Sequence, residues 1–435
     1  MRTSVMLFTR DLRVEDNPAL AEAARSDRVL PLFVADPWIL ERSARNRVAF
    51  LAEALAELDR ELRALGGGLV VRRGETVAEA LRAANTAGAD RIHLAEDVGA
   101  FAGRRAQRLT KEAAQAGIEV VGHPGVTVVP PGSLLPSGGG DHYKVFTPYW
   151  KAWEVADRRA EAPTPPSLRL PDGVEEDGSL YPDPTREGIG VLSPGRMHGG
   201  ADSAERLRAW LADGIALYEK HRDDLAADAT SRLSTDLRFG RVSPLVLERA
   251  AHRQGEAGGA FVRQLAWRDF HHQVLEAFPA LPRADYRPRN AEWHDDEEAF
   301  AAWAEARTGL PIVDAGMRQL LHEGFMHNRA RLITAGYLTR ILRVHWKRGA
   351  DHFHALLTDG DLADNYGNWQ WVAGTGNDTR PNRGFNPVRQ ALRYDPQGEY
   401  VRRYVPELAH VPGSDVHEPW KLPGVAYHPP LETPA

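Results

Sequence analysis

The sequence predicts an N-terminal α/β domain with a doubly wound, Rossmann-like sheet of five parallel strands, joined by a long connector to an all-α domain. Three observations support this fold class. Short apolar runs alternate with helical patterns over residues 1–130, proline and glycine crowd residues 131–200, and one helical pattern follows another within residues 201–435. A length of 435 residues is ample for two or three domains with cores of their own.

Strand and helix signals alternate in the N-terminal domain. Amphipathic stretches such as 46–65 separate the strands, and Thr76 is placed to cap a helix over 77–87, with Glu79 at the capping-box position. Ligands of such sheets bind at the carboxyl ends of the strands. No glycine-rich phosphate-binding signature follows a strand, so the sequence predicts no phosphate cradle here. The expected strands are Ser4–Thr9, Arg28–Val34, Gly68–Arg72, Arg91–Ala95 and Ile118–Gly122.

The connector and the second domain differ in composition from the first. Six prolines between Pro163 and Pro184 exclude a long helix in the connector. Eight of the 11 tryptophans follow residue 200. Filling of helical cores explains most of them, but Trp369 and Trp371 lie among glycine, asparagine and aspartate. This polar setting favours a site where rings stack on a flat ligand.

Composition excludes several kinds of site. The chain has no cysteine, which excludes disulfides, a thiolate nucleophile and a zinc–cysteine site. No apolar run approaches the ~18 residues of a membrane helix, so no membrane partner is predicted. Charged residues follow the first apolar run at once, which indicates a strand rather than a signal peptide, and a cytoplasmic location is expected. The acidic stretch 359–361 lacks the rest of a metal-binding loop, and no metal site is predicted.

The net charge of −6 disfavours a nucleic-acid partner, but DNA responds to local charge rather than to the average. From Arg318 to Gly349 there are seven Lys or Arg and one acid, and from Asp378 to Arg403 six arginines and three acids. Each run alone is equally well explained by a solvated helix face. Because the two runs flank the tryptophan-rich stretch, they favour a nucleic-acid surface.

Two polar clusters precede the tryptophan-rich stretch. The hydroxyls and Arg232 of the TSRLS segment at 230–234 suggest an anion site ahead of a helix, although a simple cap explains them better when they are taken alone. Gln264, Trp267, Arg268 and His271 share one face of a predicted helix. Such polar groups are expensive to bury unless they meet polar partners, which indicates either a pocket or a buried polar network.

A third cluster, MHNRAR at 326–331, places Asn328 and Arg331 on one side of a helix and Arg329 on another. One helix could therefore serve an internal ligand and an external one. The tryptophan-rich DGDLADNYGNWQW segment at 359–371 follows.

Together and in this order, these segments resemble the DNA photolyase/cryptochrome family, and most closely its class I cyclobutane pyrimidine dimer photolyases. LFTRDLRVEDNPAL, YKVFTPYW, TGLPIVDAGMRQL and FNP add to the resemblance, which extends from about Val5 to Trp420. The resemblance implies an α/β antenna domain over residues 1–130, an interdomain connector over 131–200, and a helical FAD-binding and DNA-binding catalytic domain over 201–435.

The resemblance implies that FAD lies within the helical domain. The hydroxyl cluster would bind the pyrophosphate, Arg331 would pair with Asp359 near the flavin ring, and Asn365 would lie at the flavin N5. The implied FAD-binding positions are Tyr218, Thr230, Ser231, Arg232, Leu233, Ser234, Gln264, Arg268, His271, Asn328, Arg331, Asp359, Gly360, Asp361 and Asn365. Three tryptophans, Trp369, Trp346 and Trp303, match the family's electron-transfer chain from flavin to surface.

The family's substrate is damaged DNA, from which the dimer is flipped out of the duplex. Trp267 and Trp371 would stack on the dimer, and Arg222 and Gln390 would contact the DNA backbone. Gln264, Asn328 and Arg329 would make polar contacts, and the protein is expected to act as a monomer.

One departure concerns the substrate. Cyclobutane-dimer photolyases usually have Glu where this chain has Gln264, which also occurs in (6-4) photolyases and animal cryptochromes. The catalytic His of the (6-4) type would fall at Leu332 and is missing, so a cyclobutane dimer is the expected substrate. A photoreceptor without repair activity is the alternative, and a (6-4) photolyase is a weaker one.

The resemblance also implies a second, antenna chromophore in the α/β domain. Loose matches favour an 8-hydroxy-deazaflavin, while folate or an empty site are the alternatives. The positions implied are Phe33, Asp36, Arg47, Asp97 and Arg238.

Overall fold

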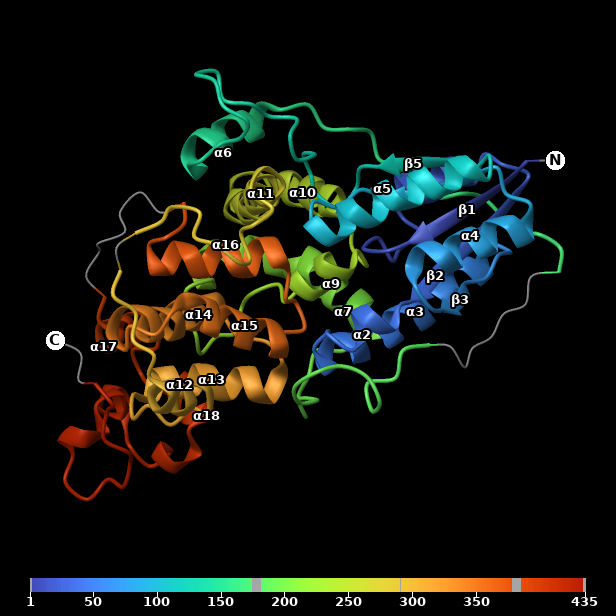
Figure 1. Cartoon of the computed structure of the whole chain (residues 1–435). Helices are drawn as coiled ribbons and strands as arrows, with labels where there is room; N and C mark the ends of the chain where they lie inside the picture. The colour runs from blue at the N-terminus through green and yellow to red at the C-terminus, as the bar shows by residue number, and fades with distance from the viewer. Residues whose placement is uncertain (1, 174–180, 290, 378–384, 433–435) are drawn as a thin grey trace. The chain divides into compact units, whose positions relative to one another are not determined.

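The computed structural model describes residues 2–173, 181–289, 291–377 and 385–432 (Figure 1). The chain divides into two compact units. Unit 1 consists of Met1–Gly190, His198–Ile215 and Ser231–Pro279, and unit 2 of Val191–Met197, Ala216–Thr230 and Ala280–Ala435. The predicted domain boundaries at 130 and 200 stay predictions.

Unit 1 contains the predicted five-stranded parallel sheet, in the order β3-β2-β1-β4-β5. This confirms the fold class, and the observed strands differ from the expected ones by at most two residues at either end. The strands are β1 (Thr3–Phe8), β2 (Arg28–Ala35), β3 (Val70–Arg73), β4 (Arg91–Ala95) and β5 (Glu119–His123).

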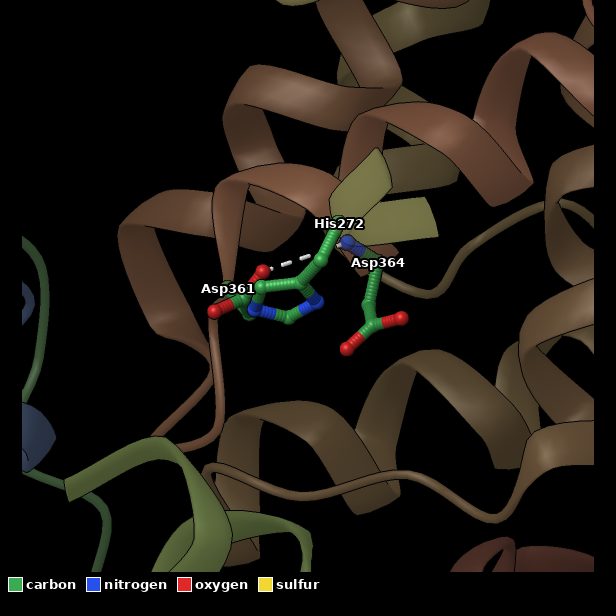
Figure 2. Close-up of side chains that lie close together, drawn as sticks. All are labelled: His272, Asp361 and Asp364. Carbon is green, nitrogen blue, oxygen red and sulfur yellow. Dashed lines mark hydrogen bonds between the residues drawn. The ribbon is translucent and has the colours of Figure 1, made fainter. Parts of the chain in front are cut away.

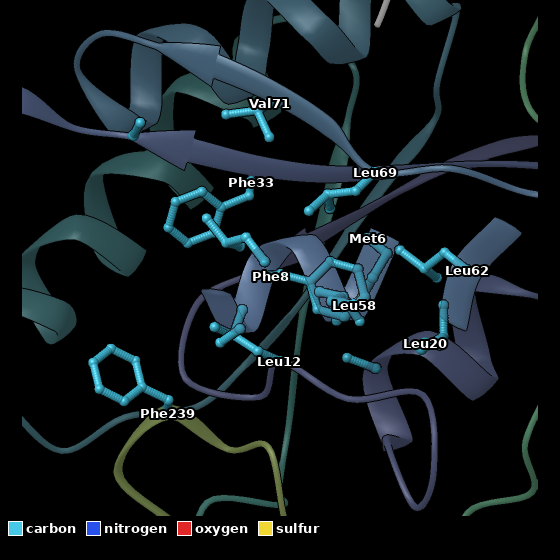
Figure 3. Close-up of a cluster of buried hydrophobic side chains, with 14 of the residues drawn as sticks. Met6, Phe8, Leu12, Leu20, Phe33, Leu58, Leu62, Leu69, Val71 and Phe239 are labelled. Carbon is cyan, nitrogen blue, oxygen red and sulfur yellow. The ribbon is translucent and has the colours of Figure 1, made fainter. Parts of the chain in front are cut away.

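Two apolar layers cover the faces of the sheet. Met6 and Phe8 of β1 point into one layer, shown in Figure 3, where they meet α1 (Pro18–Ala23) and α3 (Arg45–Ala64). The alternate β1 residues Val5 and Leu7 point into the other layer, against α4 (Thr76–Ala87) and α5 (Ala100–Gln115). This division is the period-two alternation of a strand that is buried on both faces.

The cap of α4 corrects one prediction. Thr76 is the first residue of the helix rather than its cap, because its backbone N–H and its hydroxyl both donate to Asp36 Oδ2, at 3.0 and 2.9 Å. Glu75 caps the helix instead, and its carboxylate accepts from the N–H groups of Val77 and Ala78. A carboxylate at a helix N-terminus is also favoured by the helix dipole.

The first helices after the connector belong to unit 1. Phe239, at the end of α9, stacks on Phe50 of α3 at 4.9 Å between ring centroids. Gly240 follows with φ +69°, and a Cβ there would lie 2.0 Å from the Arg10 carbonyl oxygen, so only glycine permits this approach to the end of β1. The remaining helices of this unit are α2 (Pro37–Leu40), α6 (Phe146–Val155), α7 (Ala201–Ala209), the π-helix η2 (Trp210–Gly214), α9 (Ser234–Phe239), α10 (Pro244–Arg253) and α11 (Glu256–Ala277).

Unit 2 is helical, and α8 (Ile215–His221) leads into it. Its core brings α13 against α14 and α18, and α15 against α16. The elements are α12 (Glu297–Ala304), α13 (Pro311–Glu323), α14 (Asn328–Gly336), η3 (Tyr337–Ile341), α15 (Trp346–Leu356), α16 (Leu362–Ala373), α17 (Pro387–Tyr394), α18 (Glu399–Tyr404), η4 (Pro406–Leu408), η5 (Gly413–His417) and η6 (Pro419–Lys421). Among the described helices of the whole chain, none is long and apolar enough to cross a membrane.

Candidate functional site

The polar face predicted from Gln264 to His271 lies on α11 of unit 1. Trp267 is half-buried, because one face of its indole stacks on Phe146 of α6 with 3.7 Å between ring centroids. Arg268 is 9% exposed, and its guanidinium donates to the Val126 carbonyl at 2.6 Å. His271 is also buried and is tilted against Trp267. The face therefore combines a buried polar network with a half-buried edge at Gln264 and Trp267.

Asp269 holds this helix in place, a role that the sequence reasoning missed. Its Oδ2 accepts three hydrogen bonds of 2.9–3.0 Å, from the backbone N–H groups of Val128 and Val129 and from Trp153 Nε1. Burial raises the pKa of Asp269 to about 6. Three donors thus satisfy Oδ2 of a carboxylate with 1% exposure, whereas Oδ1 is buried without a hydrogen-bond partner among the described residues and lies 3.9 Å from Arg268 Nη1. The sequence signal for this role was the acidic residue directly after Trp267 and Arg268.

The hydroxyl cluster 230–234 has an unusual backbone. Arg232 adopts φ +51°, a left-handed conformation that is rare outside glycine. Ser231 Oγ accepts from the N–H of Leu233 at 3.2 Å, and Ser234 begins α9. Among the residues that the structure describes, Thr230 Oγ1 and Thr235 Oγ1 are buried without a hydrogen-bond partner. Thr230 lies in unit 2 and Thr235 in the first turn of α9 in unit 1, and each buried hydroxyl is left unsatisfied by the described residues.

In unit 2, Arg331 and Asp359 form the predicted pair. The guanidinium donates two hydrogen bonds to the carboxylate, at 3.2 and 2.7 Å, and a third to the Met326 carbonyl at 2.8 Å. Asp359 is 8% exposed, so this fork-to-fork contact is a buried, charge-assisted one. Its position beside a flavin stays a prediction.

The segment from Asp361 to Asn365 begins α16. Asp361 Oδ1 accepts from the N–H groups of Ala363 and Asp364, at 2.8 and 3.3 Å, and caps the helix. Figure 2 shows the second of these bonds, from Asp364. Asn365 is 9% exposed, and its amide Nδ2 donates to the Ala350 carbonyl of α15 at 2.9 Å. This bond fixes the rotamer of Asn365 and leaves Oδ1 as its remaining acceptor.

The three predicted electron-transfer tryptophans are all buried in unit 2. Trp369 and Trp303 are in edge contact at 6.0 Å between ring centroids, and Trp303 Nε1 donates to the Thr334 carbonyl. Trp346 Nε1 donates to Asp285 Oδ1 at 2.7 Å. Trp303 is 0% exposed, so its ring does not reach the surface, and its part in electron transfer stays a prediction. Phe353 and Thr334 enclose its ring, and burial of this kind cannot be read from the sequence.

Trp293 is a tryptophan that the sequence reasoning missed. It is half-buried, and its ring lies 5.1 Å from that of His345, which in turn lies 5.5 Å from that of Trp346. Three adjacent rings thus connect the buried Trp346 to a partly exposed indole. The only signal in the sequence is an indole in the polar stretch that precedes α12.

The predicted DNA-contacting residues of unit 2 are at least partly accessible. Asn328 is exposed, and Trp371 and Gln390 are half-buried. Arg329 donates to Asp223 Oδ1 at 2.8 Å and lies 4.7 Å from the Tyr394 ring centroid.

Tyr218, predicted to bind the cofactor, lies beside Arg222, whose guanidinium is 6.0 Å from its ring centroid. Burial raises the pKa of Tyr218 to about 12, so its hydroxyl stays protonated at neutral pH and can donate a hydrogen bond.

The first basic run is largely neutralised by acids from other segments. Of its seven cations, five are ion-paired within the described part of unit 2. The pairs are Arg318–Glu407, Arg329–Asp223, Arg331–Asp359, Lys347–Asp351 and Arg348–Glu297. In the second run, Arg380 and Arg383 lie outside the described residues. The first run therefore contributes less free positive charge than the sequence alone indicates.

Three of the predicted antenna residues, Phe33, Asp36 and Asp97, lie at or just after the carboxyl ends of β2 and β4. Phe33 belongs to the core, Asp36 follows β2 and is held by Thr76, and Asp97 follows β4 and pairs with Arg10 at 3.0 Å. Arg10 also donates weakly to the carbonyl of Arg238, at 3.4 Å.

Arg47, the remaining predicted antenna residue, is buried at 4% exposure. The sequence reasoning missed Trp38 and Phe101, which stack at 4.9 Å and are 51% and 37% exposed. It also missed Arg105, whose Nε is buried without a partner among the described residues. An exposed aromatic pair beside an unsatisfied guanidinium is typical of a ligand-binding edge.

Two family models match the chain. Residues 4–167 match that of DNA photolyase, and residues 261–428 match that of the FAD binding domain of DNA photolyase. A deoxyribodipyrimidine photo-lyase of Streptomyces griseus is 51% identical over 431 residues, which is 98% of this chain and 94% of that protein. The chain belongs to the DNA photolyase/cryptochrome family.

Other members of the family are similar over almost the whole length. The deoxyribodipyrimidine photo-lyase of Escherichia coli (strain K12) is 35% identical over 97% of this chain and 92% of that protein. A bacterial class III photolyase from Agrobacterium tumefaciens has a TM-score of 0.91 at 31% identity, covering 99% of this chain and 94% of that structure. An archaeal photolyase from Sulfolobus tokodaii, solved with two FAD molecules, has a TM-score of 0.87 at 32% identity, with coverages of 99% and 96%. Relatives of more than one class are thus similar to this member of the family.

The match to the FAD-binding domain supports FAD as the cofactor of this photolyase-family chain. The residues present fit such a group. The unsatisfied Thr230 hydroxyl suits a phosphate oxygen, and the buried Arg331–Asp359 pair and the Oδ1 of Asn365 suit the polar edge of a flavin.

Proposed function

We propose that this protein is a class I photolyase that repairs cyclobutane pyrimidine dimers in DNA with light. The observation that carries the proposal is the 51% identity to a deoxyribodipyrimidine photo-lyase over 98% of the chain, with nearly every family site position filled. Reduced FAD, when bound, supplies the light-absorbing group and the electron that splits the dimer. We further propose that the protein acts as a cytoplasmic monomer.

The chain's own residues would bind and orient FAD. Thr230, whose hydroxyl is left unsatisfied, would donate a hydrogen bond to the pyrophosphate, as would Ser231 and Ser234. Arg331, which is paired with Asp359, would supply positive charge beside the flavin ring. Because Nδ2 of Asn365 is engaged by α15, its Oδ1 is the atom that would accept a hydrogen bond from a protonated flavin N5. The bond to Ala350 would thus make Asn365 favour the flavin that is protonated at N5.

Trp369 and Trp346 would supply electrons when an oxidised flavin is reduced in the light, and Trp293 would replace Trp303 as the exposed end of the route. His345 lies between Trp346 and Trp293 and keeps the ring-to-ring steps short. Trp303, enclosed beside Trp369, would be a side branch rather than the exit.

Residues of both units would contact the damaged DNA. Phe146 covers one face of Trp267, so only the other face can stack on a base. Arg329 would have to exchange Asp223 for a DNA group, and this exchange makes its contribution sensitive to salt. Gln264 of unit 1 would make a polar contact to the flipped dimer. In unit 2, Trp371 would stack on the dimer, and Arg222 and Gln390 would contact the DNA backbone.

A photoreceptor of the cryptochrome type is the second candidate function. A Synechocystis cryptochrome has a TM-score of 0.90 at 28% identity, covering 100% of this chain and 97% of that structure. Gln264 also lacks the carboxyl group that favours repair. A (6-4) photolyase is disfavoured by Leu332, which stands where that class has a histidine.

We also propose a second chromophore at the carboxyl ends of β2 and β4. The exposed Trp38–Phe101 pair offers a flat surface, and the unsatisfied Arg105 Nε offers a donor for an acidic oxygen. An 8-hydroxy-deazaflavin, which has an aromatic ring system and an acidic oxygen, fits this combination.

The function is tested by substrate choice. Reduced protein is illuminated with oligonucleotides that contain a cyclobutane dimer, a (6-4) product or no lesion, and the remaining lesions are counted by chromatography. We expect loss of the cyclobutane dimer alone. Loss of the (6-4) product alone would mean that this lesion, and not the cyclobutane dimer, is the substrate. Survival of both lesions would favour the photoreceptor function.

A further inference from the structure

Tyr366 is a buried tyrosine beside the electron route of unit 2. It projects from α16, is 5% exposed, and meets the ring of Trp346 edge-on at 6.4 Å between centroids and 83° between planes. Its hydroxyl donates to Asp351 Oδ1 at 2.7 Å. A phenol with a carboxylate acceptor is therefore in ring contact with one of the proposed electron-transfer tryptophans.

The hydrogen bond to Asp351 is what makes Tyr366 a usable electron donor. A phenol that loses one electron becomes a strong acid, so its oxidation is favourable only if the hydroxyl proton leaves at the same time. Asp351 is within the distance that proton transfer to a general base requires. Its side chain is 47% exposed and ion-paired with Lys347, so a proton taken up here can pass to solvent.

The other partner, Trp346, is arranged to carry positive charge. Its Nε1 donates to Asp285 Oδ1 at 2.7 Å, and a carboxylate at this distance stabilises a cation on the indole. The indole is 0% exposed, which limits screening by water. A hole on Trp346 therefore persists next to Tyr366.

We propose that Tyr366, with Asp351 as its proton acceptor, is a terminal electron donor of this protein. The proposal rests on the proposed function, because it requires an oxidised flavin to take the first electron in the light. Trp369 then gives one electron to the flavin, and Trp346 gives one to Trp369. Tyr366 gives one electron to Trp346 and its hydroxyl proton to Asp351. Both indoles end neutral, and the products are a neutral tyrosyl radical and a protonated Asp351.

The route through Tyr366 differs chemically from the route through Trp293. Trp293 would give an electron through His345 and leave a tryptophan radical near the surface. Tyr366 gives an electron together with a proton and traps the hole in a neutral, buried radical. The identity of the radical therefore distinguishes the two routes, and deuterated water slows only the step that moves a proton.

The test is a flash experiment on the FAD-containing protein with its flavin oxidised. Radicals are followed by transient absorption and by electron paramagnetic resonance after freeze-trapping, for the wild type, Tyr366→Phe, Asp351→Asn and Tyr404→Phe. Tyr404 is the matched control, because its hydroxyl also donates to a carboxylate, that of Glu323, and its ring packs edge-on against Tyr400. Flavin absorbance and circular dichroism establish that each variant is folded and loaded.

We expect a tyrosyl spectrum in the wild type and in Tyr404→Phe, growing as the tryptophan signal decays and growing more slowly in deuterated water. Tyr366→Phe and Asp351→Asn should lose it and keep the tryptophan signal. Photoreduction that proceeds without a tyrosyl radical in the wild type, or a tyrosyl radical that survives Tyr366→Phe, would overturn the proposal and leave the indole route intact. Absence of any flavin photoreduction would overturn both the indole route and the proposal.

Discussion

Gln264 presents an amide on α11 where the cyclobutane-dimer enzymes of the family usually present a carboxyl group. An amide donates a hydrogen bond to a dimer carbonyl, but it delivers no proton to the radical anion formed during splitting. Its neighbours Trp267 and Arg268 are held by Phe146 and Val126. The surroundings of Gln264 are therefore fixed, and the side chain can be exchanged for glutamate without rebuilding the face.

The first prediction is that Gln264→Glu leaves repair unchanged or improves it. The variant restores a carboxyl group of nearly the same size. The measurement is the rate of cyclobutane-dimer loss under light with chemically reduced protein. A loss beyond about tenfold, equivalent to roughly 1.4 kcal/mol of transition-state stabilisation, would contradict the proposed role of this position.

The second prediction is that Trp293→Phe slows flavin photoreduction by roughly tenfold or more, which corresponds to about 1.4 kcal/mol in the limiting barrier. The reason is that Trp293 is the partly exposed end of the ring series through His345. The rate is measured from flavin bleaching under blue light with an added reductant. Trp420→Phe, which changes a half-buried indole of η6 that has no place in the proposed route, is the control. A wild-type rate of flavin photoreduction in Trp293→Phe would mean that another residue is the exposed end of the electron route.

The element scale shows what the sequence pattern could and could not predict. The β1 residues Val5 to Phe8 form a strand because apolar side chains on both faces fit a sheet covered on both sides, and the run itself shows this. The cap of α4 was missed because Thr76 is engaged by Asp36, which is distant in sequence. Trp293 lies in a polar stretch and Trp303 in the apolar run of α12, and the packing shows that Trp303 is the enclosed one.

The strand pair β4 and β5 gives a third prediction, on pH. His93 Nδ1 and His123 Nε2 are 2.9 Å apart, and burial together with the positive charge of His123 lowers the pKa of His93 to about 4. Unfolded His93 takes up a proton near pH 6.5, whereas folded His93 stays neutral until about pH 4. The stability that the neutral ring contributes is therefore complete above pH 6.5 and is lost as the pH falls towards 4.

We expect this loss to reach about 3 kcal/mol in the wild type relative to His93→Gln, because one pKa unit corresponds to roughly 1.4 kcal/mol. Urea unfolding of both proteins between neutral and mildly acidic pH measures it. His410→Gln, at an exposed position, is the control for the loss of a histidine elsewhere in the chain. A constant difference between wild type and His93→Gln across this range would mean that His93 titrates alike in the folded and unfolded chains.

At the scale of the whole molecule, a chain of net charge −6 has to bind a polyanion. The two basic runs indicated which surfaces could attract the DNA phosphates. The sequence could not show that acids such as Asp223 and Glu407 neutralise parts of the first run. Only folding brings these distant acids to the run.

The fold class could be predicted because strand and helix periodicities are local. The division into compact units could not, because it depends on contacts between distant segments.

The fourth prediction concerns salt. DNA affinity should fall as salt rises, and Arg222→Ala should reduce the slope of log affinity against log salt by about one, because one phosphate contact is removed. Arg82→Ala, which removes an exposed arginine of α4 paired with Glu79, is the control and should leave the slope unchanged. The slope is measured by fluorescence anisotropy with dimer-containing DNA. An unchanged slope in Arg222→Ala would mean that this residue does not contact DNA.

The central claim is that light absorbed by the reduced protein splits cyclobutane dimers. The most direct measurement places reduced protein with a duplex that contains one defined dimer and compares the dimer remaining after illumination with that remaining in darkness. We predict loss of the dimer and recovery of the two pyrimidines only in the light. Persistence of the dimer under illumination, while the DNA is bound and absorbance shows a fully reduced flavin, would contradict the claim.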